Sequence, residues 1–100
     1  MYRILLCCNA GMSTSMVVKK MQQAAKDSGI DVEIKAVGLE GFSDEIFNYD
    51  CCLIGPQIKF RLDELKKVAE PMNKPVVVIN SMDYGLMNGE KILRDALKLI

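Results

Sequence analysis

The sequence predicts an α/β fold, with residues 1–100 forming a single domain built on a four-stranded parallel sheet of order 2-1-3-4 with helices on both faces. Short apolar runs alternate with longer amphipathic segments along the whole chain, and strands that are separated by helices run parallel with right-handed crossovers. The first and third apolar runs carry few polar residues, as interior strands do, whereas the second alternates apolar with charged residues, as an edge strand does. One hundred residues suffice for one hydrophobic core.

The elements of the first half follow from the spacing of apolar residues. Residues 2–8 are nearly all apolar and are predicted to form the first strand. A stripe of small and apolar residues predicts a helix over residues 13–28, which stops where Gly29 can adopt the left-handed conformation. Strict alternation predicts the edge strand at residues 31–37, and a short helix is expected near residues 43–47.

The elements of the second half repeat this alternation of strand and helix. Residues 50–54 predict an interior strand that stops at the Gly-Pro turn of residues 55–56. Helical spacing predicts a helix over residues 57–69, and the valine-rich segment 75–79 predicts the fourth strand. Asn88 is expected to cap a final helix. The apolar face of that helix comprises Ile92, Leu93, Ala96, Leu97 and Ile100.

Composition and charge exclude several classes of function. The chain has 13 basic and 13 acidic residues, so its net charge of zero gives no electrostatic case for binding nucleic acid or an acidic membrane. No apolar stretch approaches the roughly 20 residues that span a bilayer. The apolar start is too short for a signal peptide, so a cytoplasmic protein is expected.

The four cysteines form two adjacent pairs, Cys7-Cys8 and Cys51-Cys52. Neighbouring residues of a strand point to opposite faces, and neither pair has the C-x-x-C spacing of zinc or redox sites, so reduced thiols are expected. Cys8 closes the first strand whereas Cys51 and Cys52 open the third, which separates them by roughly 13–16 Å along the strands. Cys7, Cys51 and Cys52 are therefore predicted to be structural.

The segment after Cys8 is predicted to form an anion cradle. A strand, a turn of small and hydroxyl residues and a helix N-terminus bring backbone N–H groups together, and the helix dipole favours negative charge there. The same donors stabilise a thiolate, so Cys8 at the mouth of the cradle is the candidate nucleophile for holding a phosphoryl group as phosphocysteine. The candidate phosphoryl-binding loop consists of Asn9, Ala10, Gly11, Met12, Ser13, Thr14 and Ser15. Any of the three hydroxyl residues can instead be the helix N-cap.

Two other phosphate chemistries lack their residues. A cysteine phosphatase loop needs an arginine six positions after the nucleophile, where this chain has Thr14, and no Arg or Lys occurs between Cys8 and Lys19. The Walker loop is also absent, so no nucleotide or metal cofactor is indicated. The chain contains no histidine, so a catalytic imidazole must be supplied by another protein.

The string from Cys8 to Ser15 resembles the phosphorylation loop of IIB components of the bacterial sugar phosphotransferase system, and the lactose/cellobiose (chitobiose) class matches best. Three further segments match the family pattern, namely residues 55–58, 74–76 and 81–85. The resemblance implies a four-stranded parallel sheet flanked by helices. It also implies a phosphoryl relay from a phosphohistidine on a IIA partner to Cys8, and then to a sugar, such as a β-linked disaccharide, in the membrane IIC transporter.

Two residues at the same edge of the predicted sheet complete the candidate site. Ligands of such sheets bind where connections from adjacent strands diverge, here between the first and third strands, so Cys8 and the turn before Gln57 should flank one crevice. Gln57 either faces the phosphoryl group or caps the following helix, and Tyr84 either lies on the rim or simply packs there. The alternatives to a phosphocarrier are a low-molecular-weight cysteine phosphatase or arsenate reductase, and a regulatory module with an inert loop.

Overall fold

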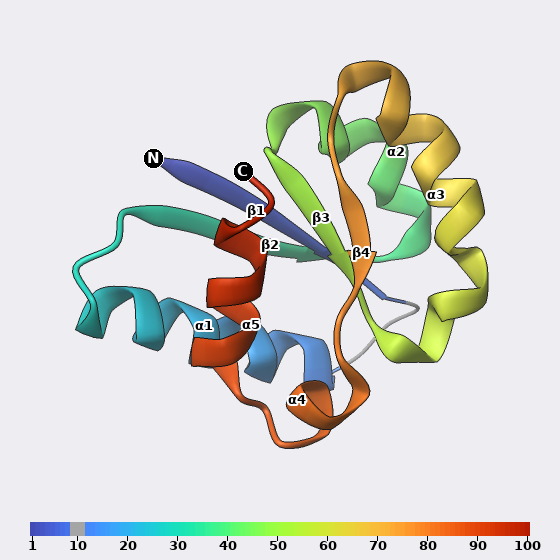
Figure 1. The fold of residues 1–100 in the computed structure, drawn as a ribbon. Helices are drawn as coiled ribbons and strands as arrows, with labels where there is room; N and C mark the ends of the chain where they lie inside the picture. The colour runs from blue at the N-terminus through green and yellow to red at the C-terminus, as the bar shows by residue number, and fades with distance from the viewer. Residues whose placement is uncertain (9–11) are drawn as a thin grey trace.

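A computed structural model describes residues 1–8 and 12–100 and contains the predicted four-stranded parallel sheet, in the order β2-β1-β3-β4 (Figure 1). The strands are β1 (Tyr2–Cys7), β2 (Val32–Val37), β3 (Cys51–Ile54) and β4 (Val76–Val78). The order confirms the prediction that the two most apolar runs lie inside the sheet and the alternating run at an edge.

The register aligns the carboxyl ends of all four strands. Cys7 pairs with Val37 on one side and with Ile54 on the other, and Ile54 pairs with Val78. The residues that leave the sheet after these positions therefore emerge at one edge. Cys8 is the first of them along the chain.

Helices cover both faces of the sheet (Figure 1). One face carries α1 (Met12–Asp27), α4 (Ser81–Gly85) and α5 (Gly89–Leu97), and the other carries α2 (Phe42–Glu45) and α3 (Leu62–Ala69). Each face has its own buried cluster of apolar side chains, so the sheet separates two half-cores.

The helix α1 shows how the sequence dictates these elements. Val17, Met21 and Ala25 are spaced at helical intervals and are at most 3 % exposed, so this stripe packs on the sheet. The helix stops before Gly29, whose φ of 68° is the left-handed conformation expected there. The packing of this stripe on the sheet fixes the position of the first turn of α1 at the carboxyl edge of the sheet.

The structure corrects three details of the prediction. The helix expected over residues 57–69 is a 3₁₀ helix, Pro56–Arg61, followed by α3, because Ile58 leaves helical geometry (φ −118°, ψ 25°) to bury its side chain. The helix α4 was not predicted, although Asn80 accepts hydrogen bonds from the backbone of its first turn. Ile100 lies beyond α5 and is 40 % exposed, so it is not part of that helix's buried face.

Short 3₁₀ helices complete the connections, at Leu39–Gly41, Ile46–Asn48 and Glu70–Met72. In the part of the chain that the structure describes, no helix combines the length and the apolar character needed to cross a membrane.

Candidate functional site

Cys8 lies at the carboxyl edge of the sheet, between the ends of β1, β2 and β3. Its backbone N–H donates to the carbonyl of Val37 at 3.2 Å, and the N–H of Gly55 donates to the carbonyl of Cys7 at 3.0 Å. A Cβ atom on Gly55 would lie 3.4 Å from the Cβ of Cys8. The thiol and the turn after β3 therefore flank one crevice, as the strand order predicts.

A chain of hydrogen bonds runs from the sulfur of Cys8 through Thr14 to the segments that follow β3 and β4. Thr14, in the first turn of α1, donates its hydroxyl to Cys8 Sγ at 2.7 Å. Thr14 Oγ1 lies 2.9 Å from the hydroxyl oxygen of Tyr84 in α4. Gln57, which follows β3, donates its Nε2 to that same tyrosine oxygen at 3.1 Å. Side chains from four separate segments thus form one hydrogen-bonded chain that ends at the sulfur.

The predicted phosphoryl-binding loop is only partly covered by the described residues. Asn9, Ala10 and Gly11 lie outside them, and α1 begins at Met12. Thr14 and the exposed Ser15 consequently lie inside the first turn of the helix, so neither is its N-cap. That turn contains no acidic residue, which leaves the positive end of the α1 dipole uncompensated near Cys8.

Burial of Cys8 corrects the expectation that the thiol opens freely at the mouth of a cradle. Cys8 is 4 % exposed and Thr14 is 3 % exposed. The hydroxyl of Thr14 contacts the sulfur directly. A phosphoryl donor can reach it only when contacts at this edge open.

The structure describes where Gln57 and Tyr84 lie, each of which had two expected roles. The 3₁₀ helix after Gly55 has no side-chain cap, so Gln57 does not cap it, and its amide is directed to Tyr84. Tyr84 is 9 % exposed and packs in the half-core of α1 and α5, while its hydroxyl reaches the polar site. The helix α4 that carries Tyr84 was not predicted, although Asn80 followed by Asp83 is a helix-start signal.

The other three cysteines lie inside the half-cores. Cys51 belongs to one cluster and Cys7 and Cys52 to the other, and each is fully buried. Burial raises the pKa of Cys7 to about 11 and that of Cys51 to about 12, and burial likewise raises the pKa of Cys52. These thiols are therefore neutral at physiological pH and poor nucleophiles.

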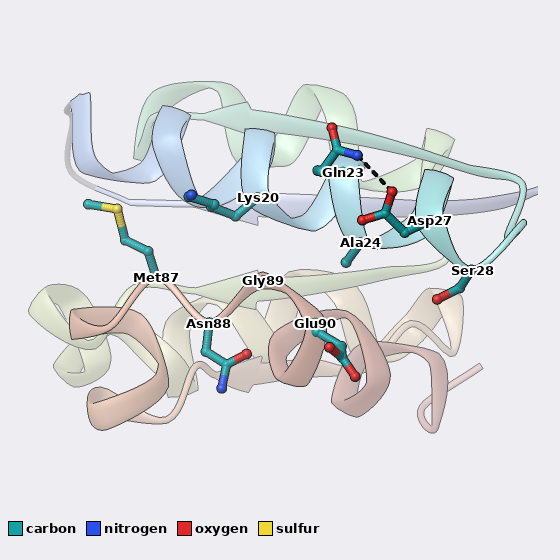
Figure 2. Close-up of a pocket in the computed structure, with 9 residues that line it drawn as sticks. All are labelled: Lys20, Gln23, Ala24, Asp27, Ser28, Met87, Asn88, Gly89 and Glu90. Atoms are coloured by element: carbon teal, nitrogen blue, oxygen red, sulfur yellow. Dashed lines mark hydrogen bonds between the residues drawn. The ribbon is translucent and has the colours of Figure 1, made fainter.

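A hollow elsewhere in the fold is distinct from the crevice at Cys8. It measures about 300 Å³ and lies between α1 and the segment that leads into α5 (Figure 2). Figure 2 shows Lys20, Gln23 and Asp27 on one wall and Asn88 and Glu90 on the other, with Gln23 donating to Asp27. The hollow contains no cysteine, and the described residues contain no group of three side chains that could hold a metal ion.

Comparison with known proteins agrees on one family. The profile described as "PTS system, Lactose/Cellobiose specific IIB subunit" matches residues 3–95. The chain is 43 % identical over 100 residues to the PTS system oligo-beta-mannoside-specific EIIB component of Bacillus subtilis (strain 168), which covers 100 % of this chain and 97 % of the relative. It is 42 % identical over 102 residues to the PTS system cellobiose-specific EIIB component of Lactococcus lactis subsp. lactis (strain IL1403), covering 97 % of this chain and 94 % of that relative.

Solved structures share the fold. The solution structure of the cellobiose-specific phosphotransferase IIB component from Borrelia burgdorferi superimposes with a TM-score of 0.82 at 39 % identity, covering 98 % of this chain and 90 % of that one. The lactose-specific IIB component domain from Streptococcus pneumoniae gives a TM-score of 0.88, with 97 % and 95 % coverage. At 19 % identity, the second likeness shows the fold alone.

Proposed function

The chain belongs to the lactose/cellobiose-specific IIB family of the phosphotransferase system, and from this membership we propose that Cys8 accepts a phosphoryl group from a phosphohistidine on a IIA partner and passes it to a sugar in a IIC transporter. The observation that carries the proposal is the hydrogen bond from the buried Thr14 hydroxyl to Cys8 Sγ. Of the four cysteines, Cys8 alone lies beyond the end of its strand, where the family's loop begins, whereas the side chain of Cys7, the last residue of β1, packs in a half-core.

The relay consists of two displacements at phosphorus. In the first, the sulfur of Cys8 forms a P–S bond as the P–N bond of the donor phosphohistidine breaks, and the thiol proton ends on the released imidazole nitrogen. In the second, a sugar hydroxyl oxygen attacks the phosphocysteine, the P–S bond breaks, and the hydroxyl proton ends on the sulfur. The absence of histidine from this chain fits a donor imidazole that arrives with the partner.

The donors around the phosphoryl group would be neutral. We propose that backbone N–H groups of the segment from Asn9 to Ser15 would stabilise the equatorial oxygens in the transition state, together with the positive end of α1. Thr14 stands where a cysteine phosphatase has its arginine, and its hydroxyl contacts the sulfur itself. Because no Arg or Lys lies between Cys8 and Lys19, the loop itself would hold the phosphoryl group loosely enough to release it, which suits a carrier better than a hydrolase.

The sugar would be a β-linked disaccharide. The relatives are named for oligo-beta-mannoside, cellobiose and galactose although each is more than 40 % identical to this chain. Sugar specificity therefore belongs to the transporter with which each IIB component works. The chain would act in the cytoplasm, docked on that transporter.

Exposed apolar side chains on the two segments that carry Gln57 and Tyr84, here called the rim, would receive the IIA donor. Phe60 lies in the 3₁₀ helix that begins after Gly55 and is 76 % exposed, and Met82 and Leu86, in and just after α4, are 72 % and 71 % exposed. Exposed large apolar side chains at one rim are typical of a protein–protein contact. Because the donor must bring its phosphorus to Cys8, it is the partner that this rim fits.

Incubation with phosphorylated IIA protein tests the proposal. We expect intact-protein mass spectrometry to show a gain of one phosphoryl group, located on Cys8 by peptide mapping. Cys8→Ser should abolish the gain, while Cys7→Ala, Cys51→Ala and Cys52→Ala, made as controls, should retain it. Label on any other residue, or rapid hydrolysis of an aryl phosphate by the unmodified protein, contradicts the phosphocarrier role.

The burial of Cys8 adds a condition that can be measured separately. The native protein, treated with iodoacetamide, should be alkylated at Cys8 faster than at Cys51, because Cys8 lies beyond the end of β1 and is 4 % exposed, whereas Cys51 lies within the interior strand β3 and is 0 % exposed. Equal rates at the two cysteines would mean that Cys8 is reached only through global unfolding.

A further inference from the structure

Tyr84 is the residue of the polar site that lies farthest from Cys8 along the chain. It reaches the site from α4, where its backbone N–H donates to the carbonyl of Asn80 at 2.9 Å. Asp83, the residue before Tyr84, forms an ion pair with Lys91 of α5 at 3.7 Å. The tyrosine ring is thus held by its own short helix and by the half-core of α1 and α5.

Counting protons fixes the direction of the hydrogen bonds. The Thr14 hydroxyl has one proton and donates it to Cys8 Sγ. With the Thr14 proton placed on the sulfur, the tyrosine hydroxyl is the donor in the contact between Thr14 and Tyr84. Gln57 donates its amide N–H to the tyrosine oxygen, because Nε2 has no lone pair to accept with. Three successive donors consequently point toward the sulfur.

We propose that Tyr84 is a positioning residue, which acts on the sulfur of Cys8 by donating to Thr14 and so holding the Thr14 hydroxyl proton on Sγ. A threonine hydroxyl inside a helix can otherwise donate to a backbone carbonyl one turn earlier. The donation from Tyr84 occupies a lone pair of Thr14 Oγ1 and leaves the hydroxyl proton of Thr14 directed to the sulfur. The low exposure of Thr14, 3 %, and of Tyr84, 9 %, keeps water from replacing either partner.

The consequence concerns negative charge on sulfur, and this step rests on the proposed function. Charge develops on Sγ whenever the P–S bond breaks, and successive hydrogen bonds polarise one another so that the last donor becomes stronger. Tyr84 would therefore speed phosphoryl transfer without touching the phosphoryl group. Loss of one such hydrogen bond is expected to lower the transfer rate about threefold to tenfold.

A double-mutant cycle separates this indirect action from simple packing. The four proteins are the wild type, Tyr84→Phe, Thr14→Val and the double variant, each measured for the rate of Cys8 alkylation by iodoacetamide and for kcat and KM of phosphoryl transfer from IIA. Tyr84→Phe should lower the alkylation rate and kcat about threefold to tenfold with KM for IIA unchanged. Thr14→Val should lower both further, and adding Tyr84→Phe to it should change nothing more. Thr14→Ser, which keeps the hydroxyl, should restore most of the rate.

The matched control is Tyr49→Phe. Tyr49 is also buried, at 4 % exposure, but it precedes β3 at the opposite edge of the sheet, so the control removes a buried tyrosine hydroxyl away from the sulfur. It should leave both rates unchanged. An equal loss in the control, an unchanged rate in Tyr84→Phe, or a Tyr84→Phe effect that persists in the Thr14→Val background overturns the positioning role.

The two readouts keep this proposal separate from the phosphocarrier proposal. Alkylation reports on the sulfur whether or not IIA phosphorylates it. A wild-type protein that takes no phosphoryl group on Cys8 while the alkylation cycle behaves as described refutes the proposed function and supports the positioning of Thr14. Phosphorylation of Cys8 with an additive alkylation cycle refutes only the positioning role.

Discussion

The contact of α5 with α1 predicts that Gly89→Ala destabilises the protein. Gly89 is the first residue of α5 and is buried against the backbone of α1. A Cβ atom there would lie 2.6 Å from the carbonyl oxygen of Lys20 and 2.6 Å from the amide nitrogen of Met21. Because both are backbone atoms of a helix interior, neither can rotate away.

The magnitude follows from this geometry. Ordinary van der Waals contact begins at 3.4 Å, so the two helices must separate by about 1 Å, and overpacking of this kind costs roughly 1–3 kcal/mol. Alanine recovers at most about 1 kcal/mol through its higher helix propensity. The net loss should lower the melting temperature by about 4–8 °C per kcal/mol in a domain of this size. Gly85, in α4, is the matched control, since a Cβ atom there meets nothing within 4 Å.

Urea denaturation followed by circular dichroism provides the assay. Gly89→Ala should shift the midpoint to lower urea at an unchanged slope, whereas Gly85→Ala should leave the midpoint unchanged or raise it slightly. The reasoning is refuted if Gly89→Ala is as stable as the wild type, or if the two alanine variants lose stability equally. The second result would attribute the effect to the backbone freedom of glycine rather than to the approach of the helices.

Three further predictions test the rim, the buried thiols and α4. Phe60→Ser should raise KM for IIA at least about fivefold, whereas Phe47→Ser, which removes a phenylalanine that is 60 % exposed before β3, should not; equal effects would remove the rim from IIA docking. The pKa of Cys51 is raised to about 12 by burial, so its neutral form stabilises the fold fully below about pH 9, and this contribution is lost as the pH rises toward 12. The free energy of unfolding should therefore fall between about pH 8 and about pH 10, and this fall should be smaller in Cys51→Val than in the wild type by about 1 kcal/mol. An identical fall in both proteins would contradict the assignment. Asn80→Ala should cost about 1 kcal/mol and slow Cys8 alkylation in the same direction as Tyr84→Phe, because it removes the acceptor for two backbone N–H groups of α4; unchanged alkylation would separate α4 from the sulfur.

The fold could be predicted because its strongest signals are local. The apolar run of β1 and the alternation of β2 fix which strand is interior and which is at the edge, and Gly29 marks the end of α1. The errors lie where tertiary packing overrides periodicity. Ile58 breaks a helical pattern in order to be buried, and α4 is too short for its apolar spacing to stand out.

Which segments of the chain meet at the candidate site could be predicted from the sequence, but the contacts between their side chains could not. Topology alone brings Cys8 next to Gly55, because parallel strands end at one edge. The contact between Thr14 and Tyr84 joins residues 70 positions apart, and it depends on where a five-residue helix directs one ring. Sequence patterns carry no information at that resolution, and for the same reason the burial of Cys8 was not anticipated.

The wide separation of the polar site along the chain has a consequence for how the protein is made. Cys8 and Thr14 leave the ribosome early, whereas Tyr84 emerges only after the last strand of the sheet. A nascent chain that has emerged only as far as β4 already contains Cys8 and Thr14, but not the tyrosine hydroxyl that contacts Thr14. The environment of the Cys8 sulfur should therefore be complete only after α4 has followed the four strands out of the ribosome, so completion of the sheet precedes completion of the polar site.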